Sequence, residues 1–215
     1  MPRHLALLLA LTCGLTAAGA PLFNGHDLAG WDYTGNPADD IAHLCAVRPD
    51  GVITAAGKPA GFIAAAGTYH DFRLHAEWRW PGKPGNGGIL ISISSGPKDR
   101  VWPVCFQIQL KHEAAGDLLP MAGATFAEPL TSKPGTTAIK AKISPDSEKA
   151  VGEWNSCDIT CRDATIDVVV NGVHQNHVTN CSVAAGRVGF QGEGTPFELS
   201  NVHLESLDGF TPARR

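Results

Sequence analysis

The sequence predicts an all-β protein, a sandwich or barrel built from many antiparallel strands. Apolar and polar residues alternate with a period of two in almost every patterned segment, which is typical of half-buried strands. The 24 Gly and 15 Pro among 215 residues suit short strands joined by tight turns. No long stretch shows the periodicity of an amphipathic helix, so a helical or mixed fold is not expected.

Composition narrows the class of protein. A length of 215 residues fits one domain with a substantial core. A hydrophobic content of 43% and a charged content of 18% are those of a globular protein. Basic and acidic residues number 17 and 21, and no run of Lys or Arg occurs, so nucleic acid is not an expected partner.

Residues 1–20 have the pattern of a secretory signal: a short polar start, an apolar core at 5–11 and small residues at 16–20. The apolar core is too short to remain as a membrane anchor. Cys13 suggests a lipoprotein, but the residues before it fit a lipobox poorly, so a cleaved signal is favoured. We therefore expect a secreted or periplasmic protein with no integral membrane segment, whose residues 21–215 form a single domain.

Removal of the signal leaves an odd number of cysteines: Cys45, Cys105, Cys157, Cys161 and Cys181. In an oxidising compartment at least one thiol must then stay free. Cys157 and Cys161 lie ~13 Å apart along one predicted strand and cannot pair easily. Cys161 and Cys181 flank a predicted hairpin and form the expected bridge. No CxxC spacing occurs, so a cysteine metal site is not expected.

The central strands follow in order along the chain. The segment 70–80 alternates most cleanly, with Glu77 and Arg79 on its polar face together with His75. The segments 88–94 and 104–111 carry Ile89, Ile91, Ile93 and Val104, Phe106, Ile108, Leu110 on their inner faces. Strands 165–171 and 173–179 flank Asn171-Gly172, the strongest short-range signal for a two-residue hairpin turn. The segments 117–126 and 144–151 are interpreted as loops.

The closing stretch 186–207 predicts two paired antiparallel strands joined by the turn 192–196. Val188 and Phe190 share one face of the first strand, and the apolar residues of the second slip in phase near Ser200-Asn201. That slip predicts a β-bulge.

Six segments in a fixed order resemble one known family: Leu22 to Gly25 with Gly30-Trp31, Asn86 to Ile89, Gln107 to Gln109, Trp154-Asn155, Asn171-Gly172, and the closing stretch. Together they resemble the 3-keto-disaccharide hydrolase domain, and the resemblance covers residues 22–207. It implies a concanavalin-like jelly-roll β-sandwich with one curved sheet and an open concave face. It also implies a sugar substrate that a separate nicotinamide-dependent sugar 3-oxidoreductase has first oxidised.

Gln107 and Gln109 share the polar face of a central strand, with Cβ atoms ~6.6 Å apart. The family usually has a glutamate where Gln107 stands, and a glutamine cannot act as a general base. Amides remain suited to binding sugar hydroxyls, because each offers a donor and an acceptor. The alternative is an ordinary solvated strand face.

The end of the same strand carries His112 and, in the following loop, Asp117. His112 is the best single candidate for a base or metal ligand, because imidazole titrates near working pH. Asp117 is a candidate substrate contact in a position where loops often carry function. The alternative for both is simple solvation.

Four further sets of residues are candidates. Glu77 and Arg79 form either a catalytic carboxylate with its cation or a plain cross-strand ion pair. Asn86 lies in a Gly-rich turn that lets backbone approach a ligand. Trp154, like Trp102, either stacks on a sugar ring or fills the core. Gln191 and Glu193 are expected at the rim of a sugar groove; the alternative for Glu193, in its Gly-x-Gly turn, is a solvated loop charge.

The implied chemistry needs one base and something to stabilise an enolate. A ketone at C3 acidifies the proton at C2, so a base such as His112, Glu193 or Glu77 removes it; the glycosidic oxygen at C1 then departs and water adds. Amide and arginine donors or a divalent metal would stabilise the enolate, but the sequence shows no ligand cluster, and the metal stays open. Common signatures such as GxSxG, HExxH and the two-carboxylate strand of jelly-roll glycosidases are absent. The alternative is a lectin-like binding module, favoured by Gln107 and by Ser92 where many members carry arginine.

Overall fold

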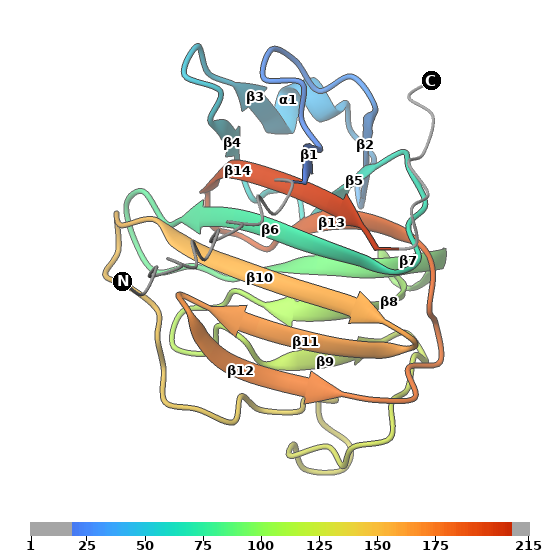
Figure 1. The fold of residues 1–215 in the computed structure, drawn as a ribbon. Coiled ribbons are helices and arrows are strands. Elements are labelled where there is room, and N and C mark those ends of the chain that lie inside the picture. The colour runs from blue at the N-terminus through green and yellow to red at the C-terminus, as the bar shows by residue number, and fades with distance from the viewer. Residues whose placement is uncertain (1–18, 208–215) are drawn as a thin grey trace, which may run out of the picture.

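The computed structural model describes residues 19–207, which form two antiparallel sheets packed face to face (Figure 1). The eight-stranded sheet runs β12 (Val173–Val178), β11 (Thr165–Val170), β10 (Asn155–Arg162), β6 (Phe72–Arg79), β14 (Phe197–Ser206), β4 (Ile53–Ala55) and β3 (Cys45–Val47), with β1 (Ala20–Pro21) also paired to β14. The six-stranded sheet runs β2 (Trp31–Gly35), β5 (Gly61–Ala65), β13 (Arg187–Gly192), β7 (Gly87–Asp99), β8 (Trp102–Gln109) and β9 (Leu118–Met121).

The predicted all-β sandwich is confirmed. One four-residue helix, α1 (Ile41–Leu44), is the only α-helix in residues 19–207. No helix in that range has the length and apolar character needed to cross a membrane. The predicted secretory signal lies almost entirely outside the described residues, so its cleavage stays a prediction.

The core lies between the sheets and follows directly from the alternation. The even-numbered residues of β6 from Phe72 to Trp78 are all at most 1% exposed. Ile89, Phe106 and Phe190 meet them from the six-stranded sheet and are equally buried. Each such side chain contributes about 1.5–3 kcal/mol of hydrophobic stabilisation. The residues between them therefore point outward on either side of the sandwich.

Two local predictions are confirmed. Asn171 and Gly172 form the turn between β11 and β12, with φ angles of 50° and 79°. Both values lie in the left-handed region that Asn and Gly tolerate, as a two-residue hairpin requires. The register of β14 against β6 shifts between Ser200 and His203, and Asn201 there has φ of 50°, so the predicted bulge is present.

The predicted pairing of the closing strands is wrong. β13 pairs with β5 and β7 in one sheet, whereas β14 pairs with β4 and β6 in the other. The turn at 192–196 therefore crosses the sandwich instead of closing a hairpin. Alternation predicts which face of a strand is buried. Here the buried faces of β13 and β14 pack against the same core from the two different sheets. Alternation says nothing about which strand is the neighbour.

A second correction concerns the segment 117–126, which was expected to be a loop. It contains β9, which pairs with β8 through Leu118 and its neighbours. Pro120 and the surrounding glycines obscure the alternation there. Residues 122–154 have no regular strand, only a single bridge between Leu118 and Lys140.

Two buried amides of β12 fix part of this irregular segment. Asn176 Nδ2 donates to Gly116 O at 3.0 Å and to Lys140 O at 3.1 Å. Gln175 Nε2 donates to Pro145 O and to Ser147 Oγ, both at 3.0 Å. Gln175 and Asn176 are both 0% exposed. These donated bonds hold the segment in one place, because breaking them would leave desolvated polar groups behind. The carbonyl oxygens of the same two side chains, Gln175 Oε1 and Asn176 Oδ1, have no partner in residues 19–207.

The cysteines of the described chain are all free and buried. The bridge expected between Cys161 and Cys181 is therefore not formed in this structure, although both line one small cavity. Burial raises the pKa of Cys181 to about 12, and the pKa of Cys161 is also raised by burial. Both thiols are accordingly protonated at neutral pH.

Candidate functional site

A row of side-chain amides crosses the outer face of the six-stranded sheet. Phe106 and Ile108 of β8 point into the core, which turns Gln107 and Gln109 outward as predicted. In the sheet register Gln109 pairs with Gly88, and Gly88 pairs with Gln191. The predicted site residues Gln107 and Gln109 of β8 and Gln191 of β13 are thus brought together across the intervening strand β7.

Gly88 lets these amides pack closely. A Cβ atom at this position would lie 2.7 Å from Gln107 Cγ and 2.8 Å from Gln107 Nε2. The side chain of Gln107 therefore lies over the glycine, and its Nε2 donates to Gln109 Oε1 at 3.0 Å. Gln107 is 2% exposed, Gln191 3% and Gln109 8%. Side chains this buried are held in fixed positions.

Glu193 stands at the edge of this cluster. Its Oε2 accepts from Asn86 Nδ2 at 2.7 Å and from Gln191 Nε2 at 3.2 Å. Both amide nitrogens donate to the carboxylate. The carbonyl oxygens of the same side chains, Asn86 Oδ1 and Gln191 Oε1, are buried without a partner in residues 19–207. Glu193 itself is exposed whereas Gln191 is buried, and the rim position expected for both beside a sugar groove stays a prediction.

The unpartnered carbonyl oxygens define what the cluster can bind. A buried acceptor without a hydrogen bond costs about 1–3 kcal/mol. A ligand with hydroxyl groups would supply the missing donors, while the carboxylate beside them would accept a proton or a further hydrogen bond. We call Asn86, Gln107, Gln109, Gln191 and Glu193 the amide cluster.

His112 lies beside the amide cluster, but its imidazole makes no hydrogen bond with the cluster in residues 19–207. Its backbone N donates to Gly85 O at 3.0 Å, next to Asn86. Its imidazole instead contacts Glu148, with 2.9 Å between Nδ1 and Oε2. The Glu148 carboxylate also accepts from Trp80 Nε1 at 3.1 Å, and the Trp80 side chain is part of the hydrophobic core.

Glu148 was missed in the sequence because it lies in the irregular segment 122–154. Nothing local marks it, since the partner histidine is 36 residues away in the chain. Its carboxyl side chain is only 2% exposed. A buried carboxylate is rare unless it is fully hydrogen-bonded, and that is a property only of the folded chain.

Asp117 lies beside the cluster and fastens the irregular segment. Gln109 N donates to Asp117 O at 2.8 Å, and Asp117 Oδ1 accepts from Lys142 N at 2.8 Å. Burial raises the pKa of the Asp117 carboxyl above its usual value. Its oxygen is already used in holding the chain, so direct contact with a ligand has no support in these contacts.

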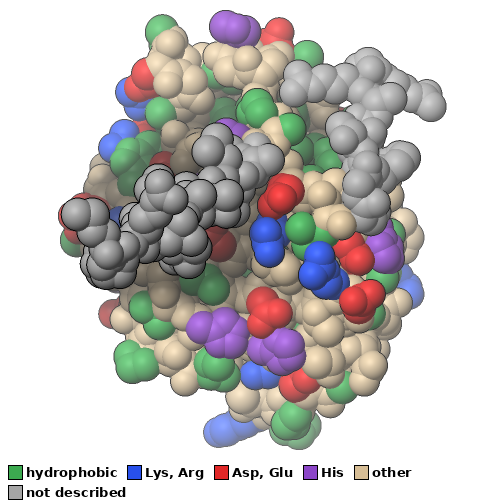
Figure 2. Space-filling view, viewed as in Figure 1, with side chains coloured by type: hydrophobic (Ala, Val, Ile, Leu, Met, Phe, Trp, Pro, Cys, Tyr) green, Lys and Arg blue, Asp and Glu red, His purple; other side chains and the backbone are tan. Residues whose placement is uncertain are grey.

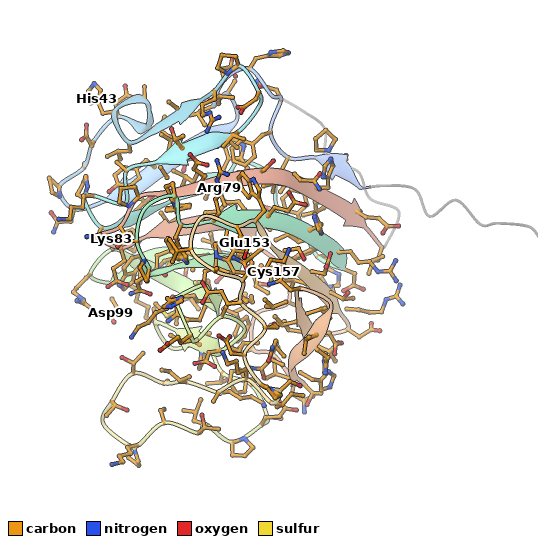
Figure 3. All side chains as sticks on the ribbon, turned by 90° about the vertical axis from the view of Figure 1, so that its left-hand side faces the viewer. His43, Arg79, Lys83, Asp99, Glu153 and Cys157 are labelled. Atoms are coloured by element: carbon orange, nitrogen blue, oxygen red, sulfur yellow. The ribbon has the colours of Figure 1, made fainter. Side chains whose placement is uncertain are left out.

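Glu77, Arg79 and Trp154 are not brought to the amide cluster. They lie on the outer face of the eight-stranded sheet, where acidic, basic and histidine side chains mingle (Figure 2). Arg79 Nε donates to Glu198 Oε2 at 2.5 Å, and its guanidinium lies 4.6 Å from the centre of the Trp154 ring. Figure 3 labels Arg79 and Cys157 on the neighbouring strands β6 and β10. Glu77 accepts from Asn201 Nδ2 at 3.3 Å, so cross-strand pairing describes this face.

Two other expectations concern tryptophan and metal. Trp102 is 6% exposed and packs with Phe62, Leu90 and Cys105 beside the amides, so it fills an apolar cluster. Within residues 19–207, no group of three or more His, Cys, Asp and Glu side chains is arranged to hold a metal ion.

The comparison with protein families gives one match over most of the chain. The model of the 3-keto-alpha-glucoside-1,2-lyase-like domain matches residues 19–205. No curated protein matches the sequence.

Solved structures share the fold at low sequence identity. A protein provisionally described as a glycosyl hydrolase, from Parabacteroides distasonis, superposes with a TM-score of 0.64 at 22% identity, covering 87% of this chain and 93% of its own. The carbohydrate-binding module CBM66 from Bacillus subtilis gives 0.59 at 12% identity, covering 84% and 98%. LamAcat from Zobellia galactanivorans gives 0.54 at 13% identity, covering 82% and 90%. At such identities these likenesses establish the shared β-sandwich alone.

Proposed function

This chain belongs to the 3-keto-alpha-glucoside-1,2-lyase-like domain family, and from that premise we propose that it cleaves 3-keto-glycosides at the amide cluster. The observation that carries the proposal is the position of Glu193. Two amides hold its carboxylate at the edge of a buried polar cluster, and their own carbonyl oxygens lack donors. The hydroxyl groups of a sugar would supply those donors, and the Glu193 carboxylate would accept the proton from C2 of the sugar.

In the proposed reaction Glu193 is the base. The ketone at C3 acidifies the C2 hydrogen, which moves to the Glu193 carboxylate as a proton. The electron pair of the C2–H bond forms the C1–C2 double bond, and the C1–O bond breaks with its pair on the departing oxygen. Water then adds across the double bond. Gln109 Nε2 has no hydrogen-bond partner in residues 19–207 and is available to the developing enolate oxygen.

The reaction changes no oxidation level overall, so the oxidised sugar must come from elsewhere. A separate sugar 3-oxidoreductase would supply it, and this is the functional partner we propose. We also propose that the protein acts after export, on the strength of the signal-like residues 1–20. Intact-mass measurement of the protein recovered from the producing cell tests the export.

A second candidate is a binding module that retains the amide cluster without catalysis. The observation in its favour is Gln107, which stands where the family usually carries a glutamate and is only 2% exposed. The carbohydrate-binding module among the solved structures has the same fold. Such a module would bind sugars through the amides and leave the glycosidic bond intact.

One experiment separates the two candidates. The purified protein is incubated with 3-keto-trehalose and with a 3-keto 4-nitrophenyl glucoside, with and without divalent metals, and release of glucose or nitrophenol is followed. We expect release from at least one substrate. Its absence under all these conditions would overturn the enzyme proposal, and calorimetric titration with the same sugars would then decide for or against the binding module.

A further inference from the structure

The buried carboxylate of Glu148 and the partly exposed imidazole of His112 form a pair that takes no part in the proton abstraction proposed for Glu193. Glu148 is 2% exposed at its side chain, and both its oxygens are occupied. Oε2 accepts from His112 Nδ1 at 2.9 Å and from Glu113 N at 2.8 Å, and Oε1 accepts from Trp80 Nε1 at 3.1 Å. Three donors compensate for the loss of hydration that burial imposes on the charge.

The residues on either side of Glu148 are fixed as firmly as the carboxylate itself. Ser147 Oγ donates to Val170 O at 2.9 Å, and Ser147 O accepts from Asn171 Nδ2 at 2.7 Å. Lys149 N donates to Asn155 Oδ1 at 2.7 Å. The irregular segment therefore cannot shift Glu148 without breaking bonds to β10 and to the β11–β12 turn. The carboxylate is held ready for its partner.

These contacts decide which nitrogen of His112 is free. A carboxylate oxygen only accepts, so the proton of the imidazole pair lies on Nδ1. Nε2 has no hydrogen-bond partner in the described part of the chain, and the side chain is 35% exposed. A histidine oriented by a buried carboxylate through Nδ1, with Nε2 open, is the arrangement that moves protons in many active sites.

The pair lies at the same end of the six-stranded sheet as Glu193. His112 N donates to Gly85 O at 3.0 Å, and Leu110 N donates to Gly87 O at 2.9 Å. Asn86, between those two glycines, holds Glu193 at 2.7 Å. His112 and Glu193 therefore flank one short turn, Gly85 to Gly87, from opposite sides. A sugar bound across that turn would meet a carboxylate on one side and an imidazole on the other.

We propose that His112 is the general acid of the reaction and that Glu148 is its positioning residue; this rests on the proposed function. As the C1–O bond breaks, the departing oxygen keeps the bonding pair and takes the proton from Nε2 of the imidazolium. His112 becomes neutral while Nδ1 still donates to Glu148. Glu193 holds the C2 proton. Proton exchange with water resets both groups, so no further reactant is needed.

The leaving group supplies the test. A sugar alkoxide is a poor leaving group that needs protonation, whereas 4-nitrophenolate leaves without help. In His112→Gln the amide still donates to Glu148 but transfers no proton. We expect about 100-fold slower release from 3-keto-trehalose and a change within about threefold for the 3-keto nitrophenyl glucoside, since general acids contribute about 10²–10⁴-fold.

Two further variants complete the design. His43 of α1, labelled in Figure 3, pairs with Asp39 at 2.8 Å on the surface, and His43→Ala is the matched histidine control with no expected effect on either substrate. Glu148→Gln should show the same leaving-group selectivity as His112→Gln to a smaller extent, about tenfold.

The outcomes are distinct. Equal losses on both substrates in His112→Gln, or no loss on 3-keto-trehalose, would overturn the assignment while leaving the proposed function intact. A wild-type protein inactive on both substrates would overturn the proposed function and this inference with it. Thermal unfolding of each variant shows whether a loss reflects the fold, and a structural loss would affect both substrates alike.

Discussion

The two outer faces of the sandwich differ in how their polar groups are satisfied. On the eight-stranded sheet the charged groups pair with each other: Arg79 with Glu198 at 2.5 Å, and His75 with Asp158 at 2.7 Å. On the six-stranded sheet the amide cluster has a single charge, Glu193, and two buried carbonyl oxygens without a donor.

This difference shows that the density of charge is a poor guide to the site. Ion pairs on a half-exposed face satisfy one another and leave little for a ligand to gain. Unpartnered buried acceptors are uncommon in folded proteins and each calls for an explanation. The proposed sugar ligand would satisfy those of Asn86 and Gln191, because its hydroxyl groups would supply the missing donors in the place where the carboxylate of Glu193 is held.

The largest expected effect distinguishes the carboxylates of the two faces. Glu193→Gln removes the proposed base and should slow cleavage of a 3-keto-glycoside by about 10²–10⁴-fold. Glu77→Gln is the matched change on the other face, where Glu77 accepts from Asn201 Nδ2 at 3.3 Å, and should leave the rate unchanged. Steady-state rates of aglycone release measure both. A loss confined to Glu77→Gln would move the site to the eight-stranded sheet.

The next effect concerns stability. Glu198 has a side chain only 11% exposed and accepts from both Arg79 and Arg48. Glu198→Ala would leave the two guanidinium groups without their shared carboxylate, and we expect a loss of about 2–3 kcal/mol of unfolding free energy, below the value for a fully buried pair. Urea unfolding measures it. Activity per folded molecule should not change, and a loss under about 0.5 kcal/mol would show that the pairs on this face do little.

The sequence predicted the strands well because each strand carries its own signal. Alternation placed the inner face of β6 correctly, and Asn171-Gly172 located a hairpin. The predictions failed where the structure depends on contacts between residues that are far apart in the chain. The turn at 192–196 joins strands of different sheets, and β9 is hidden by Pro120. Partner choice depends on packing across the whole sandwich, which no local pattern records.

The sequence likewise predicted only part of the candidate site. Alternation placed Gln107 and Gln109 on one face, and the structure brings Gln191 and Glu193 close to that face; their part in a sugar site stays a prediction. Arg79 and Glu77 alternate just as cleanly, yet lie on the opposite side of the molecule, because periodicity does not say to which sheet a strand belongs. Glu148 had no signal of its own. The role proposed for Glu148 depends on its contact with His112, which lies 36 residues earlier in the chain.

A smaller effect tests the unpartnered acceptors. Gln191→Ala removes a side chain whose Nε2 donates to Glu193 at 3.2 Å and whose Oε1 has no partner in the described chain. Losing one sugar contact should raise the KM for a 3-keto-glycoside by about three- to tenfold. Stability should be almost unaffected, because an unsatisfied acceptor is removed as well. A fall in stability without a change in KM would mean that Gln191 serves the fold alone.

The smallest effect is a pH dependence on the paired face. The hydrogen bond that His75 donates to the Asp158 carboxylate raises the pKa of His75, outweighing partial burial, and nearby Glu77 acts in the same direction. A histidine whose folded-state pKa is raised stabilises the protein below its unfolded value of about 6.5, and this contribution is lost as pH rises through the folded value. Asp158→Asn should remove less than about 1 kcal/mol at pH 5.5 and almost nothing at pH 8.5. Urea midpoints at the two pH values measure it. If the two proteins differ equally at both, the pairing of His75 does not stabilise the fold, and the contrast between the faces would then rest on the unpartnered acceptors of the amide cluster.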